Sequence, residues 1–124
     1  GAIGQGLPLA LGAAVACPDQ KVIALQADGG AMYTVQSLWT MVRENLDVTV
    51  VLLNNSSYAI LNIEMERVGV VNPSEKARSL LDLSNPTIDW VHIAQGMGMT
   101  ARRSESVADF DQQFADLDNQ QHYA

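Results

Sequence analysis

Residues 27–57 read ADGGAMYTVQSLWTMVRENLDVTVVLLNNSS: a glycine turn, a helix-length segment and an apolar run. The apolar run at residues 48–53 has no polar alternation, and a shorter one, VIAL at residues 22–25, precedes the turn. Such runs are typical of strands buried on both faces of a parallel sheet. The sequence therefore predicts a right-handed β–α–β unit, with a ligand site beyond the carboxyl ends of its strands.

Oxygen-bearing residues follow both predicted strands. Asp28 and Asn55 are far apart in the chain, but neighbouring parallel strands lie about 4.8 Å apart and would bring both side chains to one ion. With a backbone carbonyl, which we assign to Ser57, they form the all-oxygen ligand set that Mg²⁺ prefers. Gly29 and Gly30 let backbone N–H groups approach an anion. The sequence thus predicts a magnesium site that also holds a diphosphate group.

These residues form a recognisable signature. Asp28-Gly29, followed at this interval by Asn54-Asn55, resembles the Gly-Asp-Gly and distal Asn-Asn pattern of thiamine-diphosphate-dependent enzymes. The resemblance covers nearly the whole chain and is greatest to the C-terminal cofactor domain of acetolactate synthase large subunits and benzoylformate decarboxylases. It implies a three-layer, Rossmann-like α/β fold with a parallel sheet that lacks its last strand. The metal ligands that it implies are Asp28, Asn55 and Ser57.

The resemblance also assigns cofactor contacts near the N-terminus. Ile3 aligns with the apolar residue that wedges between the two rings of thiamine diphosphate and keeps the cofactor bent. Gly1 aligns with a residue whose carbonyl accepts a hydrogen bond from the aminopyrimidine, and Tyr58 joins the cofactor-binding set. Judged from the residues alone, this glycine-rich segment is equally a plain connector with a core isoleucine. Its glycines open a helix before the strand, whereas a dinucleotide fingerprint follows one.

The chain departs from the family's patterns at several positions. Ala27 replaces the first glycine of the signature, which requires an ordinary strand conformation there, and Gly30 stands where serine is frequent. Leu61 occupies the position of a catalytic glutamate in pyruvate decarboxylases, so that this segment is more similar to benzoylformate decarboxylase. No tryptophan lies between Asn55 and Trp90, unlike the pattern of acetolactate synthases.

The resemblance implies an enzyme that acts on 2-oxo acids, either a decarboxylase or a carboligase, with thiamine diphosphate and Mg²⁺ as cofactors. In the family, a glutamate that acts on the cofactor comes from the pyrimidine-binding domain of a neighbouring subunit. We therefore expect residues 1–124 to be the cofactor-binding domain of a longer chain that forms a homodimer or homotetramer, and to be inactive alone. No catalytic residue is assigned within this chain.

Three alternatives compete with this interpretation. The chain could be the cofactor-binding subunit of a split thiamine enzyme, with the pyrimidine-binding half on a separate chain. It could be a degenerate domain that binds a diphosphate-bearing ligand without catalysis, for which Ala27 is a hint. A flavodoxin-like nucleotide-binding protein fits the predicted fold but does not explain Asn54-Asn55.

The composition limits the other functions. The net charge of −7 argues against a nucleic-acid partner, since phosphate binding depends on clusters of Lys and Arg. No run of about 18 apolar residues is available to cross a membrane, and we expect a cytoplasmic protein. Cys17 is the only cysteine, which excludes a disulfide within the chain and suggests a small buried residue. The acidic residues after Arg103 are expected to form a solvated helix face.

Apolar periodicity predicts the remaining elements. Helices are expected over residues 9–17, 35–46, 58–67 and 89–98, and again after residue 104, with a strand over residues 99–102 and a substrate-side loop with a short helix over residues 68–86. Thr34 and Ser104 are candidate caps, and the helix beginning near Thr34 would direct its positive end at the diphosphate. Trp39 and Met41 are expected in the core, and His92 is expected to be structural, without a partner nearby in the sequence.

Overall fold

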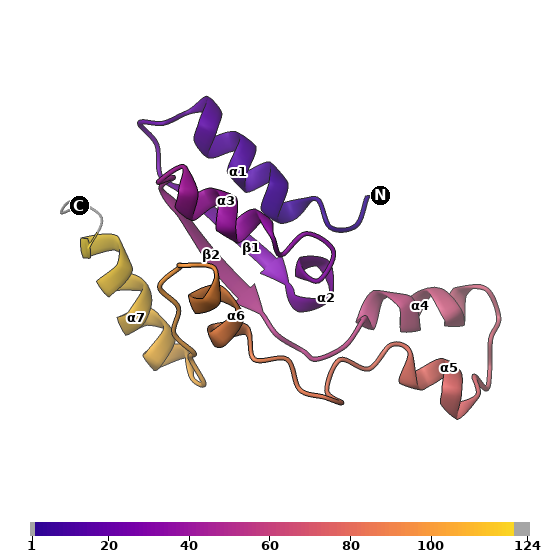
Figure 1. The fold of residues 1–124 in the computed structure, drawn as a ribbon. Coiled ribbons are helices and arrows are strands. Elements are labelled where there is room, and N and C mark those ends of the chain that lie inside the picture. The colour runs from indigo at the N-terminus through magenta and orange to yellow at the C-terminus, as the bar shows by residue number, and fades with distance from the viewer. Residues whose placement is uncertain (1, 121–124) are drawn as a thin grey trace.

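The structure, a computed structural model, describes residues 2–120. These residues form two strands and seven helices, four of which follow the second strand (Figure 1). Their order is α1 (Gly6–Ala16), β1 (Val22–Ala27), α2 (Asp28–Ala31), α3 (Ser37–Arg43), β2 (Val48–Leu53), α4 (Ala59–Arg67), α5 (Glu75–Ser79), α6 (Trp90–Gly96) and α7 (Val107–Gln120).

The two strands form the predicted parallel pair. Val22 lies opposite Val48, and the register continues to Ala27 opposite Leu53. Both strands therefore end at the same edge of the sheet, and the chain leaves that edge at Asp28 and at Asn54. The predicted β–α–β unit is confirmed, and Asp28 and Asn55 follow neighbouring strand ends, as the strand pattern predicted.

The core lies between the sheet and the helices that precede and connect its strands. Helix α1 packs on β1 and α3, and α6 adds to the same core from the side of β2 (Figure 1). The buried apolar residues are Leu7, Ala10, Ala14, Ala24, Ala31, Leu38, Met41, Val48 and Ala94. The small side chains of Ala10 and Ala14 allow α1 to lie close to the sheet, because alanine adds little width to a helix.

One face of β1 is left uncovered by the described residues. Ala24 and Gln26 are buried, whereas Ile23 is half-exposed and Leu25 is 73% exposed. The expectation that both strands are buried on both faces is therefore wrong for β1 within residues 2–120. A parallel sheet is normally covered on both sides, but the described residues leave the apolar side chains on this face of β1 exposed.

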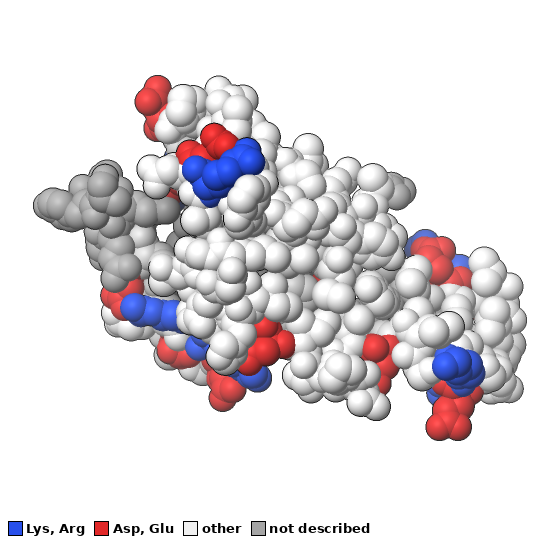
Figure 2. All heavy atoms as spheres, in the orientation of Figure 1, with Lys and Arg blue, Asp and Glu red and all other residues white. Residues whose placement is uncertain are grey.

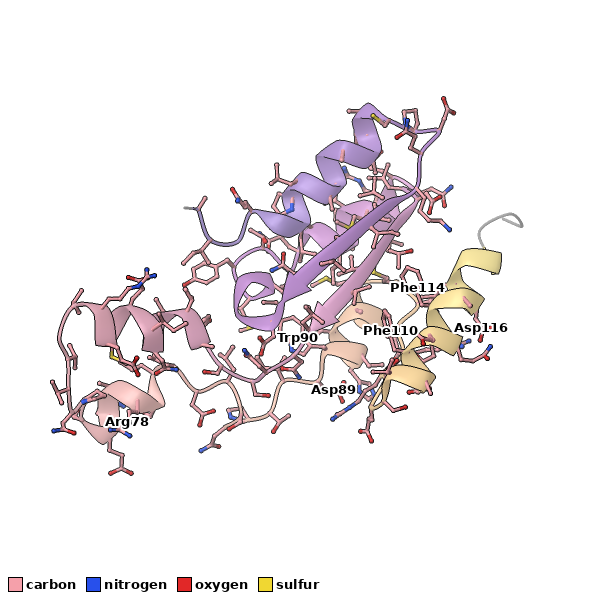
Figure 3. All side chains as sticks on the ribbon, turned by 180° about the vertical axis from the view of Figure 1, so that it is seen from behind. Arg78, Asp89, Trp90, Phe110, Phe114 and Asp116 are labelled. Atoms are coloured by element: carbon pink, nitrogen blue, oxygen red, sulfur yellow. The ribbon has the colours of Figure 1, made fainter. Side chains whose placement is uncertain are left out.

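The chain beyond β2 forms two separate groups of helices. Helices α4 and α5 form a hairpin that projects beyond the carboxyl ends of the strands, while α6 and α7 return beside β2 (Figure 1). Phe110 and Phe114 have ring centroids 5.5 Å apart and lie on the side of α7 that faces β2 and α6 (Figure 3). Val107, the first residue of α7, is exposed.

The strand expected over residues 99–102 is absent from the described part of the chain. This segment leaves α6 with the backbone N–H of Met99 donating to the carbonyl of Ala94 at 3.0 Å. Met99 and Ala101 pack against the core without joining the sheet, which has only β1 and β2 in residues 2–120. The alternating apolar residues Met99 and Ala101 have the sequence pattern of a strand, but in the structure they only pack against the core.

Both expected helix caps are wrong. Helix α3 begins at Ser37, and the Thr34 hydroxyl instead donates to the carbonyl of Gly4 at 2.7 Å. Ser106, rather than Ser104, accepts a hydrogen bond from the backbone N–H of Asp109 at 3.1 Å at the start of α7. The Thr34 hydroxyl bonds to an acceptor distant in the sequence instead of capping α3. Ser106 is the cap of α7 because that helix begins two residues later than expected.

Two further side chains, Trp39 and Cys17, differ from expectation. Trp39 is 51% exposed, with the Arg43 guanidinium 4.9 Å from its ring centroid, whereas Met41 is buried as expected. Cys17 is exposed, because α1 ends on the surface just before Pro18.

His92 does have a partner close in sequence. Its Nδ1 lies 2.7 Å from a carboxylate oxygen of Asp89, the residue that caps α6. The pair is exposed and lies on α6, and neither residue lines the cavity described below.

Charged side chains gather at the margins of the molecule. Figure 2 shows few of them over the broad middle of one face and more over α7 and the α4–α5 hairpin. Arg67 pairs with Glu64 at 2.8 Å on the surface of α4. Within residues 2–120, every helix is too short or too polar to traverse a lipid bilayer.

Candidate magnesium and diphosphate site

Asp28 is a buried carboxylate without a partner. It follows β1 directly and is only 1% exposed. Within the described part of the chain, neither of its carboxylate oxygens accepts a hydrogen bond. A buried carboxylate in this state costs several kcal/mol unless a counter-charge is supplied. Asp28 is therefore placed and desolvated as a ligand for a cation would be.

The two glycines after Asp28 let the loop that follows β2 approach. A Cβ on Gly29 would lie 2.8 Å from the Tyr58 ring and 3.6 Å from the carbonyl oxygen of Ser57. A Cβ on Gly30 would lie 2.5 Å from the amide nitrogen of Gln26. The close approach at Gly29 brings the Ser57 carbonyl to the turn that carries Asp28, so the two strand ends converge as predicted.

The loop after β2 is built from two successive Asx turns. The side-chain oxygen of Asn54 accepts a hydrogen bond from the backbone N–H of Ser56, and that of Asn55 accepts one from Ser57, each at 3.0 Å. Ser56 adopts φ 54°, a left-handed conformation, between them. A carbonyl-type oxygen has two lone pairs, so the Asn55 amide oxygen keeps one for a further partner.

The segment before α6 holds this loop from outside. The Ser57 hydroxyl donates to the carbonyl of Leu81 at 3.2 Å, and the backbone N–H of Tyr58 donates to the same carbonyl at 2.9 Å. Leu83 donates its N–H to the carbonyl of Ser56 at 2.8 Å. The loop expected over residues 68–86 thus includes the short helix α5 and supports the predicted ligand residues.

A cavity of about 130 Å³ opens at the convergence of these segments. Its lining residues are Ile3, Ala27, Gly29, Gly30, Tyr33, Asn55, Ser57, Tyr58, Ala59, Ile60 and Leu61. Most of the predicted site residues therefore share one cavity. Asp28 lies between two lining residues with its side chain buried, and Gly1 lies outside the described residues.

The N-terminal loop forms one wall of the cavity. Ile3 is 56% exposed and lines it, as a residue that contacts a ligand would. Gly4 has φ +80°, and a Cβ there would lie 2.6 Å from the Cβ of Tyr33. The Tyr33 and Tyr58 rings meet edge to face, with centroids 6.2 Å apart, and join this wall to the start of α4.

Sequence reasoning missed Gln26 and Tyr33. Gln26 is buried beneath the glycine turn, and Tyr33 lines the cavity. A signal for Gln26 was available, since strand alternation places it on the same face of β1 as the buried Ala24. No comparable signal existed for Tyr33, which follows a one-turn helix in an irregular segment.

The donor set fits Mg²⁺ bound to a diphosphate. Residues 2–120 contain no cluster of three His, Cys, Asp or Glu side chains that could enclose a metal ion. Asp28 is thus the one carboxylate offered here, next to neutral amide and carbonyl oxygens. Mg²⁺ commonly binds through one or two carboxylates and substrate phosphates. The unpaired carboxylate and the glycine turn match that arrangement.

A second cavity, of about 280 Å³, lies between α4 and α5. Its lining includes Met65, Val71 and Arg78, and Figure 3 shows Arg78 on the projecting hairpin, far from Trp90 and α7. None of its lining residues is buried. Although this cavity is larger, it lacks the desolvated charge found at Asp28.

Comparison with known proteins agrees with this site. Residues 1–123 match the family described as "Thiamine pyrophosphate enzyme, C-terminal TPP binding domain". The chain belongs to this family. The match confirms the predicted family. It also confirms the predicted cofactor, because thiamine pyrophosphate is another name for thiamine diphosphate.

Several proteins with known names are similar in sequence to this chain. It is 56% identical over 111 residues to IlvX of Mycobacterium tuberculosis, provisionally named as an acetolactate synthase large subunit, covering 89% of this chain and 22% of the relative. It is 50% identical over 60 residues to the alpha-keto-acid decarboxylase of Mycobacterium avium, covering 48% of this chain and 11% of the relative.

A solved structure confirms the fold. The 4-hydroxybenzoylformate decarboxylase of Rhodococcus jostii matches 94% of this chain with a TM-score of 0.81 and 32% identity, over 21% of its own length. The family member described here thus spans about a fifth of the length of IlvX and of this decarboxylase.

Proposed function

We propose that this chain is the thiamine-diphosphate- and magnesium-binding domain of a longer 2-oxo acid decarboxylase or carboligase. The observation that supports the proposal most directly is the Asp28 carboxylate, buried without a partner beside a glycine turn. Such a carboxylate gains its missing counter-charge from the metal ion, and the metal ion neutralises the diphosphate. The names of the relatives, which include decarboxylases of 2-oxo acids, support the substrate class.

Each site residue has a proposed role. Asp28, Asn55 and the Ser57 carbonyl hold Mg²⁺, and Gly29 and Gly30 present backbone N–H groups to the diphosphate. Ile3 and Tyr58 contact the organic part of the cofactor, as does Gly1, which lies outside the described residues. These roles are consistent with a shared cavity and with the burial of Asp28.

Bound thiamine diphosphate supplies a nucleophilic carbon and takes up the electrons released when a 2-oxo acid loses CO₂. The chain's own residues bind and orient the cofactor. Ile60 and Leu61 give the cavity an apolar wall at the start of α4. Within residues 2–120, tyrosines are the only ionisable side chains that line the cavity. Acid–base groups therefore come from other parts of the enzyme.

The partner that completes the site is proposed to be the pyrimidine-binding domain of a neighbouring subunit. A homodimer or homotetramer in the cytoplasm would provide it. The exposed apolar face of β1 supports the idea that further protein covers this chain. The reaction is proposed to be either decarboxylation or carboligation. The apolar Leu61 favours decarboxylation, while the sequence identity to IlvX favours the acetolactate synthase group.

Titration calorimetry tests the proposal. The chain should bind thiamine diphosphate in the presence of Mg²⁺, and binding should weaken at least about a hundredfold when Mg²⁺ is removed or in Asp28→Ala, because the diphosphate then lacks its counter-charge. Asp19→Ala, which removes an exposed carboxylate, is the control. Equal binding with and without Mg²⁺, or none by a folded chain, would favour the degenerate-domain alternative.

A further inference from the structure

We infer that Gln26 is a positioning residue, which holds the N-terminal loop and the turn at residues 28–30 in one fixed arrangement. The inference rests on the proposed function, because both segments contribute lining residues to the proposed site. Gln26 is only 8% exposed, on the face of β1 that packs against the core. Burying a primary amide at that place is costly unless its polar groups are used.

The carboxamide of Gln26 lies between two glycines. A Cβ on Gly6, the first residue of α1, would overlap its oxygen, and a Cβ on Gly30 would lie 2.5 Å from its nitrogen. Both glycines therefore leave space that the amide fills. The side chain spans from the start of α1 to the glycine turn, two segments that lie side by side in Figure 1.

The amide nitrogen also fixes the peptide next to Asp28. Nε2 of Gln26 donates to the carbonyl oxygen of Ala27 at 3.0 Å. That carbonyl belongs to the peptide bond joining Ala27 to Asp28, so the hydrogen bond restricts the backbone from which the unpaired carboxylate projects. Residues that orient a metal ligand from behind typically contribute strongly to metal affinity.

A second contact fastens the same N-terminal loop. The Thr34 hydroxyl donates to the carbonyl of Gly4 at 2.7 Å, and Gly4 packs closely on Tyr33. The loop that carries Ile3 is thus held by a hydrogen bond at Gly4 and by packing of Gln26 at Gly6, where the loop enters α1. Gln26 also contacts the turn at Gly30 and bonds to the peptide before Asp28. It therefore connects the N-terminal wall of the cavity with the proposed ligand Asp28.

The first test measures Mg²⁺ affinity at saturating thiamine diphosphate. Gln26→Ala should lose about tenfold to about a hundredfold, the usual effect of removing a residue that orients a ligand. Gln26→Met, which keeps the length but has no N–H donor, should lose affinity as well without a matching loss of thermal stability. Gln5→Ala, an exposed glutamine of the same loop without a capping hydrogen bond, should be unchanged. Full affinity in both Gln26 variants would overturn the inference.

The second test needs no ligand and separates this inference from the proposed function. In the metal-free chain, Gln26→Met should increase amide hydrogen exchange in residues 4–7 and 28–31 together, while β2 keeps its protection. If the unmodified chain binds no cofactor, the proposed function fails, yet this exchange pattern still decides whether Gln26 connects the segments. Unchanged exchange, or an increase in one segment alone, would overturn the inference.

A double-mutant cycle tests whether Gln26 and Gly30 share the same space. Gly30→Ala should weaken Mg²⁺ binding because its Cβ displaces the amide. Gly30→Ala combined with Gln26→Ala should be no weaker than Gln26→Ala alone, since the displaced group is already gone. Additive losses would contradict the inference, because a merely destabilising pair gives independent effects.

Discussion

The unpaired carboxylate of Asp28 should lower the stability of the metal-free chain. Replacing it by Asp28→Asn removes a buried charge while keeping the shape, so the free energy of unfolding without metal should rise by about 1–3 kcal/mol. Urea denaturation with chelator measures this change. The same variant should gain no stability from Mg²⁺ and thiamine diphosphate. Asp19→Asn, at an exposed position, controls for the change in net charge. A less stable metal-free Asp28→Asn chain would indicate that the carboxylate has a partner.

Two glycines of the same chain should respond in opposite directions to alanine. A Cβ on Gly29 would lie 2.8 Å from the Tyr58 ring, so Gly29→Ala should destabilise the chain by about 1–3 kcal/mol, as overpacking does. Gly12, inside α1, has no atom within 4 Å of such a Cβ, so Gly12→Ala should stabilise it by about 0.5–1 kcal/mol. Thermal unfolding monitored by circular dichroism measures both, and equal effects would show that Gly29 is not closely packed.

The places of Asp28, Asn55 and Ser57 at the strand ends were predictable, because each follows an apolar run whose pattern indicates a strand. The burial of Gln26 could be predicted from strand alternation, but its packing against Gly6 and the hydrogen bond of Thr34 could not, because those partners are distant in the sequence. The Thr34 hydroxyl reaches Gly4, thirty positions earlier, whereas a local pattern offered it only as a cap. Local hydrogen bonds and long-range ones compete for the same donor, and the sequence shows only the local candidates.

Helix α6 begins at a cap that should make its stability depend on pH. The Asp89 carboxylate accepts a hydrogen bond from the backbone N–H of His92 at 3.0 Å, and its other oxygen lies 2.7 Å from the His92 ring. These bonds, the backbone one first, lower the pKa of Asp89 from its ordinary value. A lowered pKa in the folded state contributes stability that is present above the unfolded pKa, about 3.9, and lost as pH falls through the folded value.

The melting temperature of the chain should therefore fall more steeply below about pH 4 than that of Asp89→Asn, which can cap the helix without titrating. The difference between the two proteins isolates Asp89, because Asp82, whose pKa is lowered by its hydrogen bonds from Ser84, is present in both. Thermal melts from pH 6 to pH 2.5 make the comparison. Parallel curves would show that the cap does not contribute.

Strands and most helices were predictable because their periodicity is a property of the local sequence. Strands β1 and β2 and helices α4 and α6 lie close to their expected positions. The absence of the strand expected over residues 99–102 was not predictable, because a strand must pair with the edge of a sheet and the local sequence does not show whether one is nearby. Met99 and Ala101 pack against the core without such pairing. The same limit applies to β1: its apolar pattern predicts a covered face, but no element within residues 2–120 covers Ile23 and Leu25.

The chain should bind its cofactor yet leave 2-oxo acids unchanged. The tyrosines are the only ionisable groups lining the cavity in residues 2–120, and Ile3 is half-exposed at its wall. General acid–base catalysis needs a titratable group within hydrogen-bonding distance of the reacting atoms, and water reaches an open site freely. Binding and turnover are thus expected to separate in this chain.

Assays of CO₂ release from pyruvate and from benzoylformate test this separation. With saturating Mg²⁺ and thiamine diphosphate, no release above that of the free cofactor is expected. A parallel thermal melt should confirm that the chain is loaded, because a ligand at a hundred times its dissociation constant adds about 2.7 kcal/mol of stability. Asp28→Ala should abolish the thermal shift and leave the release unchanged. Release that exceeds the free cofactor and disappears in Asp28→Ala would instead mean that the chain alone contains a complete active site.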